Sequence, residues 1–155
     1  EYIFLGGSMI IQLIMAFLGT LSFAILFNIP KSEYLFSGLT GVIGWGSFLI
    51  FRNIFSSRVY ATLIASLIIT LVSRLFAVNR KLPVTVFLLS GIFPLVPGAG
   101  IYYTAYYIFS NDLKQAAGKG IDAISSALAI AFGIIIISMI PQRYFVWKKK
   151  KEDAK

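Results

Sequence analysis

Long apolar runs place the strongest constraint on the fold of this chain. Five of them follow one another, at residues 8–29, 34–51, 59–77, 83–109 and 121–140, and the short stretches between them carry charged residues, Pro or Asn. A helix needs roughly 20 apolar residues to cross a hydrocarbon layer of ~30 Å. Runs of this length predict transmembrane helices rather than the alternating pattern of half-buried strands. The sequence therefore predicts an all-α integral membrane protein with about five transmembrane segments.

The chain divides into a membrane domain and a basic tail. We expect residues 1–147 to form a single transmembrane helical domain and residues 148–155, KKKKEDAK, to form a cytoplasmic tail. Of the 155 residues 58% are hydrophobic and 13% charged, which excludes an ordinary soluble domain. The net charge is +8, but the positive residues stand between and after the apolar runs, so they indicate topology and not nucleic-acid binding.

Two topologies remain open for the fourth run. If it crosses the bilayer, most Lys and Arg residues share the cytoplasmic side with the tail, as such residues usually do. If it re-enters as a hairpin, the two sides carry more similar numbers. We favour five crossings of the cell inner (plasma) membrane, with the C-terminus in the cytoplasm and the N-terminus outside.

The residue types exclude much covalent chemistry. The chain contains no Cys and no His, so a thiolate nucleophile, a His general base and a His-based metal site are absent. We expect no catalytic residues, no metal and no cofactor, and we do not expect an enzyme.

The fourth run contains a break, P-x-x-P-G-A-G. Pro94 and Pro97 lack an N–H group, and in a helix each would collide with the carbonyl four residues earlier. Gly98 and Gly100 permit backbone angles closed to other residues. We expect two half-helices that meet near the bilayer midplane, the second beginning near Ile101. In hydrocarbon such a break is tolerated only where it is buried in protein or lines an aqueous cavity; a proline kink that only shapes the bundle is the alternative.

The chemistry of the break suits a zwitterion. Free N–H groups at the start of the second half-helix carry the positive end of the helix dipole and suit a carboxylate. Carbonyls freed around Ser90 to Phe93 suit an ammonium group or a cation. An amino acid offers both groups, so a small carboxylate-bearing substrate is expected.

Tyrosines follow the break at helical spacing. Tyr102 and Tyr106 share one helix face, and Tyr103 and Tyr107 share the next. One pair can line a pathway while the other packs or reaches lipid headgroups, since tyrosines are common at membrane interfaces.

Three ionisable residues lie close to apolar segments. Arg74 is placed near the end of the third segment, where a long side chain can snorkel. Asp122 is expected in the first turn of the fifth, where it suits the helix dipole. Asp112 precedes that segment. We keep Arg74 and Asp112 as candidates for coupling or gating and assign Asp122 a structural role.

Several stretches, in this order and spacing, resemble the small membrane subunit of the threonine/serine exporter family: FNIP at 27–30, GVIGWGS at 41–47, SR at 73–74 and IFPLVPGAGIYYTAYYIF at 92–109. The resemblance runs from about residue 8 to 147. It implies a larger membrane partner subunit, or a homo-oligomer, and export of small polar metabolites driven by an ion gradient. With the shared face of Tyr106, it makes these the candidate substrate-binding residues: Pro94, Pro97, Gly98, Gly100, Tyr102, Tyr103 and Tyr106.

Two other functions stay open. A split-subunit branch of the family is associated with succinate, so a subunit of a dicarboxylate exporter is the first alternative. The second is a membrane assembly or scaffold subunit that transports nothing and buries its broken helix against a partner.

Overall fold

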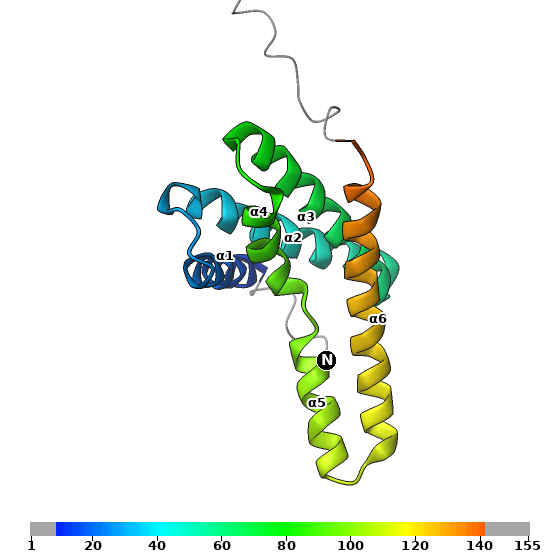
Figure 1. Cartoon of the computed structure of the whole chain (residues 1–155). Helices are drawn as coiled ribbons and strands as arrows, with labels where there is room; N and C mark the ends of the chain where they lie inside the picture. Colours follow the sequence, from blue (N-terminus) through cyan, green and yellow to red (C-terminus); the bar gives the residue numbers. More distant parts are fainter. Residues whose placement is uncertain (1–8, 142–155) are drawn as a thin grey trace, which may run out of the picture.

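The computed structural model describes residues 9–141, and the predicted basic tail lies outside the described residues. The described part consists of helices and turns, without a strand (Figure 1). Its α-helices are α1 Met9–Leu26, α2 Tyr34–Phe55, α3 Arg58–Arg80, α4 Val84–Ile92, α5 Gly98–Phe109 and α6 Leu113–Ser138. Two short 3-10 helices, η1 Lys31–Glu33 and η2 Phe93–Leu95, precede α2 and follow α4. The prediction of an all-α protein is confirmed.

Four of these helices are long and apolar enough to cross a membrane: α1, α2 together with η1, α3, and α6. The pair formed by α4 with η2 and by α5 passes the same test together, but it is bent by 48° at the intervening break. The described residues thus contain four helices of spanning length, or five crossings if the bent pair counts as one.

Several helix ends differ from the sequence-based bounds. Helix α2 continues past Phe51 to Phe55, and α3 continues past Ala77 to Arg80. Helix α6 begins at Leu113 and not at Ile121. Apolar content marks where a helix meets lipid, whereas its ends depend on capping. Asp112 caps α6, because its side chain accepts a hydrogen bond of 3.1 Å from the Gln115 N–H.

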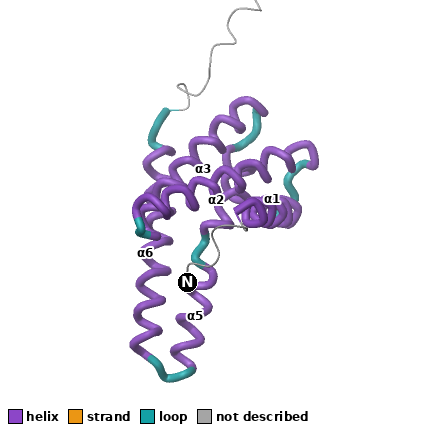
Figure 2. Tube along the Cα trace, turned by 180° about the vertical axis from the view of Figure 1, so that it is seen from behind, coloured by secondary structure: helices purple, strands orange, loops and turns teal. Residues whose placement is uncertain are grey.

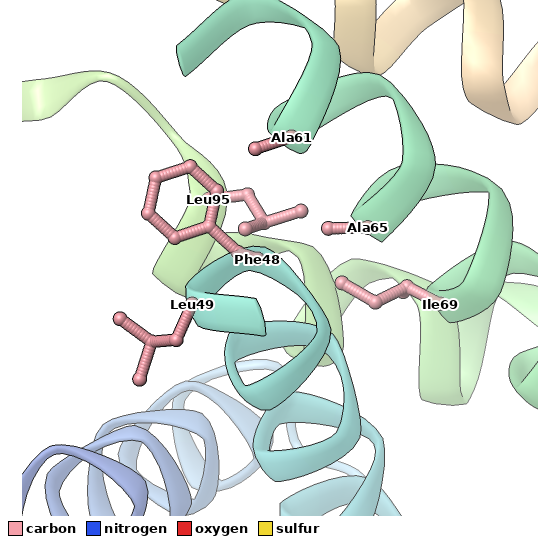
Figure 3. Close-up of a cluster of buried hydrophobic side chains, with 6 residues drawn as sticks. All are labelled: Phe48, Leu49, Ala61, Ala65, Ile69 and Leu95. Carbon is pink, nitrogen blue, oxygen red and sulfur yellow. The ribbon is translucent and has the colours of Figure 1, made fainter. Parts of the chain in front are cut away.

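The core lies where α2, α3 and η2 meet. Leu95 of η2 packs beside Phe48 of α2 and Ala61 and Ala65 of α3, and all four are buried (Figure 3). Small residues allow this approach, since a side chain at Gly44 would overlap Ile69. The core therefore holds η2, and with it the start of the break, against the α2–α3 pair.

Helix α6 runs parallel to α3. The Ser66 hydroxyl donates a hydrogen bond of 3.3 Å to the Ala129 carbonyl, and Arg74 further along α3 donates to the Ile137 carbonyl further along α6. On both helices the second contact lies C-terminal to the first. The two helices therefore run in the same direction where they contact each other.

Helices α5 and α6 form a hairpin that projects from the rest of the protein (Figures 1 and 2). Residues 110–112 connect the two helices. No residue of α5 is buried, and α5 packs on α6 as its one substantial neighbour among the described elements. Most of the α5 surface is therefore left uncovered.

Helix α1 packs on α2 and reaches the break. The Trp45 indole N–H donates a hydrogen bond of 3.2 Å to the Gln12 side-chain oxygen. The rings of Phe23 in α1 and Phe93 in η2 stack with centroids 3.5 Å apart. The ring contact therefore holds η2 against α1.

An ion pair joins two segments far apart in the sequence. Both carboxylate oxygens of Glu33 accept from the Arg80 guanidinium, at 2.8 and 2.9 Å, and that guanidinium also lies 4.8 Å from the centre of the Phe36 ring. Glu33 is 3% exposed. The pair ties the connection between α1 and α2 to the C-terminal end of α3.

Candidate functional site

The backbone between η2 and α5 differs from the expected arrangement, in which carbonyls before the break and N–H groups after it both lack helical partners. The Val96 N–H donates to the Phe93 carbonyl at 3.1 Å, so that carbonyl, expected to be free, has a partner. Pro97 directly precedes α5, which begins at Gly98, earlier than the expected start near Ile101. Pro94 lies in the short 3-10 helix η2, since a 3-10 helix can follow an α-helix where a proline prevents the α-helix from continuing.

The two glycines of the break are ordinary helical residues. No described glycine has a positive φ angle, so the expectation of special backbone angles at Gly98 and Gly100 is wrong. Gly100 serves close packing: a Cβ atom added there would lie 3.1 Å from the Cβ of Ala123 in α6. A Cβ atom at Gly98 would meet nothing within 4 Å.

A cavity of about 140 Å³ lies beside the start of α5. It is bounded by three elements: the first turns of α5, the N-terminal end of α3 and the middle of α6. Its lining residues are Arg58, Pro97, Ala99, Gly100, Tyr103, Lys119, Asp122 and Ala123. Three of the predicted substrate-binding residues, Pro97, Gly100 and Tyr103, therefore come together at one cavity.

Charged side chains surround this cavity. Arg58 is the first residue of α3, and Lys119 and Asp122 are three residues apart on α6. Within the described residues, no ion pair or side-chain hydrogen bond engages any of the three. Arg58 and Asp122 are exposed and Lys119 is half-buried. The cavity thus presents two cations and one carboxylate that have no side-chain partner among residues 9–141.

The start of α5 adds backbone donors. The first N–H groups of a helix lack intrahelical acceptors. In α5 the N–H groups of Gly98 and Ile101 bond to the Val96 and Pro97 carbonyls, which leaves those of Ala99 and Gly100, and no described side chain caps them. Both residues line the cavity, so the positive end of the α5 dipole lies at its wall.

The break lies beside the N-terminal end of α3 and part of the way along α6. Pro97 shares the cavity with Arg58, where α3 begins, and with Asp122 inside α6. Before the break, α4 and η2 extend along α3, and Leu95 packs with Ala61. The expected position near the bilayer midplane stays a prediction.

The other candidate substrate-binding residues lie apart from this cavity. Pro94 faces a separate hollow between α1 and α2, beside Gln12 and Trp45. Tyr102 and Tyr106 are exposed on α5, at 64% and 52%. Gly98 also lies outside the cavity lining.

Arg74 does not snorkel from a helix end. Helix α3 continues to Arg80, and Arg74 is only 8% exposed. Its guanidinium donates to the Ile137 carbonyl in the last turn of α6, where a cation offsets the negative end of the helix dipole. Arg74 lies about 24 Å along α3 from Arg58, at ~1.5 Å per residue, so it does not belong to the cavity.

The two aspartates lie at other places along α6 than expected. Asp112, a candidate for coupling or gating, is the N-cap of α6. Asp122, expected in the first turn of that helix, lies well inside it and at the cavity. Both line a neighbouring hollow on α6, which also includes Lys119. In the described part of the chain, no group of acidic residues is arranged to hold a metal ion.

Sequence reasoning missed the three charged residues of the cavity. The sequence singled out neither Arg58 nor Lys119, and it favoured a structural role for Asp122 at a helix end. The spacing of Lys119 and Asp122 puts both on one helix face, which the sequence shows. That both line a cavity follows only from the packing of α3 and α5 against α6.

Comparisons with known proteins give one match. The family model described as "Threonine/Serine exporter, ThrE" matches residues 12–140. No curated protein and no solved structure matches the chain.

Proposed function

Because the chain belongs to the threonine/serine exporter family, we propose that it is a membrane subunit of a secondary exporter of threonine- or serine-like amino acids, driven by an ion gradient. The observation that carries this proposal is the charged cavity beside α5. It offers cations and helix N–H groups to a carboxylate and one carboxylate to an ammonium group. At ~30 Å³ of liquid volume per water molecule, its size suits a small polar metabolite.

The helix directions support five crossings. With α3 and α6 parallel, the chain between them must cross the bilayer once if both helices span it. A re-entrant hairpin would return the chain to the side it left and make the two helices antiparallel. The parallel pair therefore favours five crossings, with the two termini on opposite sides of the membrane. The distribution of Lys and Arg favours the orientation with the N-terminus outside and the C-terminus in the cytoplasm.

The uncovered face of α5 supports a partner. Ile101, Tyr102, Tyr106 and Phe109 are 58%, 64%, 52% and 90% exposed. Such a row of large side chains on a projecting hairpin is suited to contact with protein. We assign this contact to the larger family subunit that the sequence resemblance implies, or to a second copy of the chain.

Export of a dicarboxylate is the second candidate, favoured by the excess of cations at the cavity. Counterflow in proteoliposomes tests both functions. Vesicles containing the protein, with and without the larger partner, are loaded with threonine, serine or succinate, and exchange with labelled substrate is measured. We expect exchange of threonine or serine; exchange of succinate alone would favour the dicarboxylate exporter.

A scaffold role predicts a different result. Pro97→Ala alters the wall of the cavity, whereas Gly19→Ala alters α1 where an added Cβ meets nothing within 4 Å. We expect Pro97→Ala to abolish exchange while membrane insertion stays normal, and Gly19→Ala to leave exchange unchanged. Equal exchange by both variants would contradict a substrate site at this cavity, and no exchange by any form of the complex would favour the scaffold.

A further inference from the structure

Three charged side chains around the cavity form no ion pair and no side-chain hydrogen bond among the described residues. Arg58, Lys119 and Asp122 come from two helices and meet at one space, yet none is engaged in an ion pair there. Lys119 and Asp122 are three apart on α6, a spacing at which opposite charges can attract.

The cavity carries charges of both signs. Arg58 comes from α3, and Lys119 and Asp122 both come from α6. The N–H groups of Ala99 and Gly100 add positive potential from α5. A ligand that carries one negative and one positive group can satisfy all of these groups at once.

We propose that Arg58 and Lys119 bind the carboxylate of the substrate, that Asp122 binds its ammonium group, and that Asp122 thereby selects zwitterionic amino acids over dicarboxylates. This inference rests on the proposed function, since it assigns the selectivity of the same cavity.

Each group suits its role. A guanidinium binds a carboxylate through two parallel hydrogen bonds, and a lysine ammonium acts as a compact point charge beside it. Asp122 offers two acceptor oxygens to an ammonium group, which is a charge-assisted hydrogen bond.

The carboxylate of Asp122 disfavours the alternative substrate. A dicarboxylate such as succinate can use both cations, but its second carboxylate then shares the cavity with Asp122. Two like charges then meet in a small cavity, and specificity arises from that repulsion as much as from attraction to the correct ligand. An acid without an amino group, such as 3-hydroxybutyrate, leaves Asp122 without a partner.

The test uses the complete transporter in proteoliposomes, with any required partner subunit present. Labelled threonine is exchanged against threonine, succinate or 3-hydroxybutyrate. For Asp122→Asn we expect threonine exchange to fall by about tenfold, as when one hydrogen bond to a charged group is lost. Inhibition by succinate and 3-hydroxybutyrate should rise relative to the unaltered protein. Asp122→Glu, which keeps the carboxylate, should retain the preference for threonine.

A substitution of Arg58 provides the second part of the test. Arg58→Gln should weaken exchange or inhibition by all three compounds, because each contains a carboxylate. Arg52→Gln is the matched control: it removes the same charge near the end of α2, outside the cavity lining, and should change nothing. Elution as a single species and the thermal midpoint in detergent establish that each variant is folded.

The outcomes separate the two proposals. If the unaltered complex exchanges threonine but Asp122→Asn keeps both its rate and its preference, the role of Asp122 is overturned while the exporter function stands. If the unaltered complex neither exchanges nor is thermally stabilised by threonine, the proposed function fails and this inference fails with it.

Discussion

Ser66 of α3 donates a hydrogen bond to the Ala129 carbonyl of α6 at 3.3 Å, and it does so beside Gly133. A Cβ atom at Gly133 would overlap the Ser66 hydroxyl and lie 3.1 Å from the backbone nitrogen of Leu67. Since burial of apolar area gives little advantage over lipid inside a bilayer, helices there depend on such close approach. The contact fixes α6 against α3 and so fixes which part of α6 reaches the cavity.

The first prediction concerns this contact. Gly133→Val should destabilise the protein by about 1–3 kcal/mol, because the added methyl groups force α3 and α6 apart. Thermal unfolding in detergent measures the change. Gly19→Val is the control, because a Cβ at that position meets nothing within 4 Å; a similar loss in both variants would contradict the close-packing argument.

The ion pair between Glu33 and Arg80 gives the second prediction. Arg80→Gln leaves the buried carboxylate of Glu33 without its bidentate partner, so the midpoint of thermal unfolding should fall. Lys81→Gln removes a neighbouring exposed charge and should have a smaller effect. The double variant Glu33→Gln with Arg80→Gln should recover part of the loss, since no charge is then left buried; no recovery would argue against the pair.

The third prediction concerns the wall of the cavity. Gly100→Ala places a methyl group 3.1 Å from the Cβ of Ala123, so α5 must move away from α6. We expect slower threonine exchange and a slightly lower thermal midpoint. Gly118→Ala on the same hairpin meets open space and should not lower the midpoint. A fully active Gly100→Ala variant would show that this approach of α5 to α6 is dispensable.

The fourth prediction tests the topology. The chain contains no cysteine, and three serines in the connections can each be replaced by one. Ser57→Cys and Ser110→Cys should react with a membrane-impermeant maleimide added outside intact cells. Ser32→Cys should react only after the membrane is opened. Labelling of Ser57→Cys and Ser110→Cys from opposite sides would instead indicate a re-entrant fourth segment.

The fifth prediction concerns the uncovered face of α5. Tyr106→Cys should be protected from labelling, or cross-linked, when the larger subunit is co-expressed or when the chain self-associates. Tyr60→Cys on α3 is the control, since Tyr60 is also exposed, at 62%, but lies on a different helix. Equal reactivity of Tyr106→Cys with and without the partner, and no cross-linked dimer, would contradict a protein contact there.

Local chemistry explains why much of the fold could be predicted. The apolar runs predicted the helices, and Pro94 and Pro97 predicted the place where the fourth run is interrupted. The start of α6 could not be predicted in the same way. Its first turns, with Lys114 and Lys119, are too polar to be part of an apolar run, yet they belong to the helix that Asp112 caps.

The candidate site was predictable only in part. Pro97, Gly100 and Tyr103 are close in sequence, so any structure of the break keeps them near one another. Arg58 and Asp122 are distant in sequence, and their approach depends on the register of two packed helices.

The sequence by itself determined that this chain is a helical membrane protein with an interrupted fourth segment, because hydrophobicity and the missing N–H of proline act locally. Only the tertiary structure decided that α6 runs parallel to α3 and that the break lies beside the N-terminal end of α3. It also decided that Arg58, Lys119 and Asp122 meet there. These features follow from how small residues such as Gly133 and Gly100 let particular helix faces approach, and that register is a property of the packed helices together.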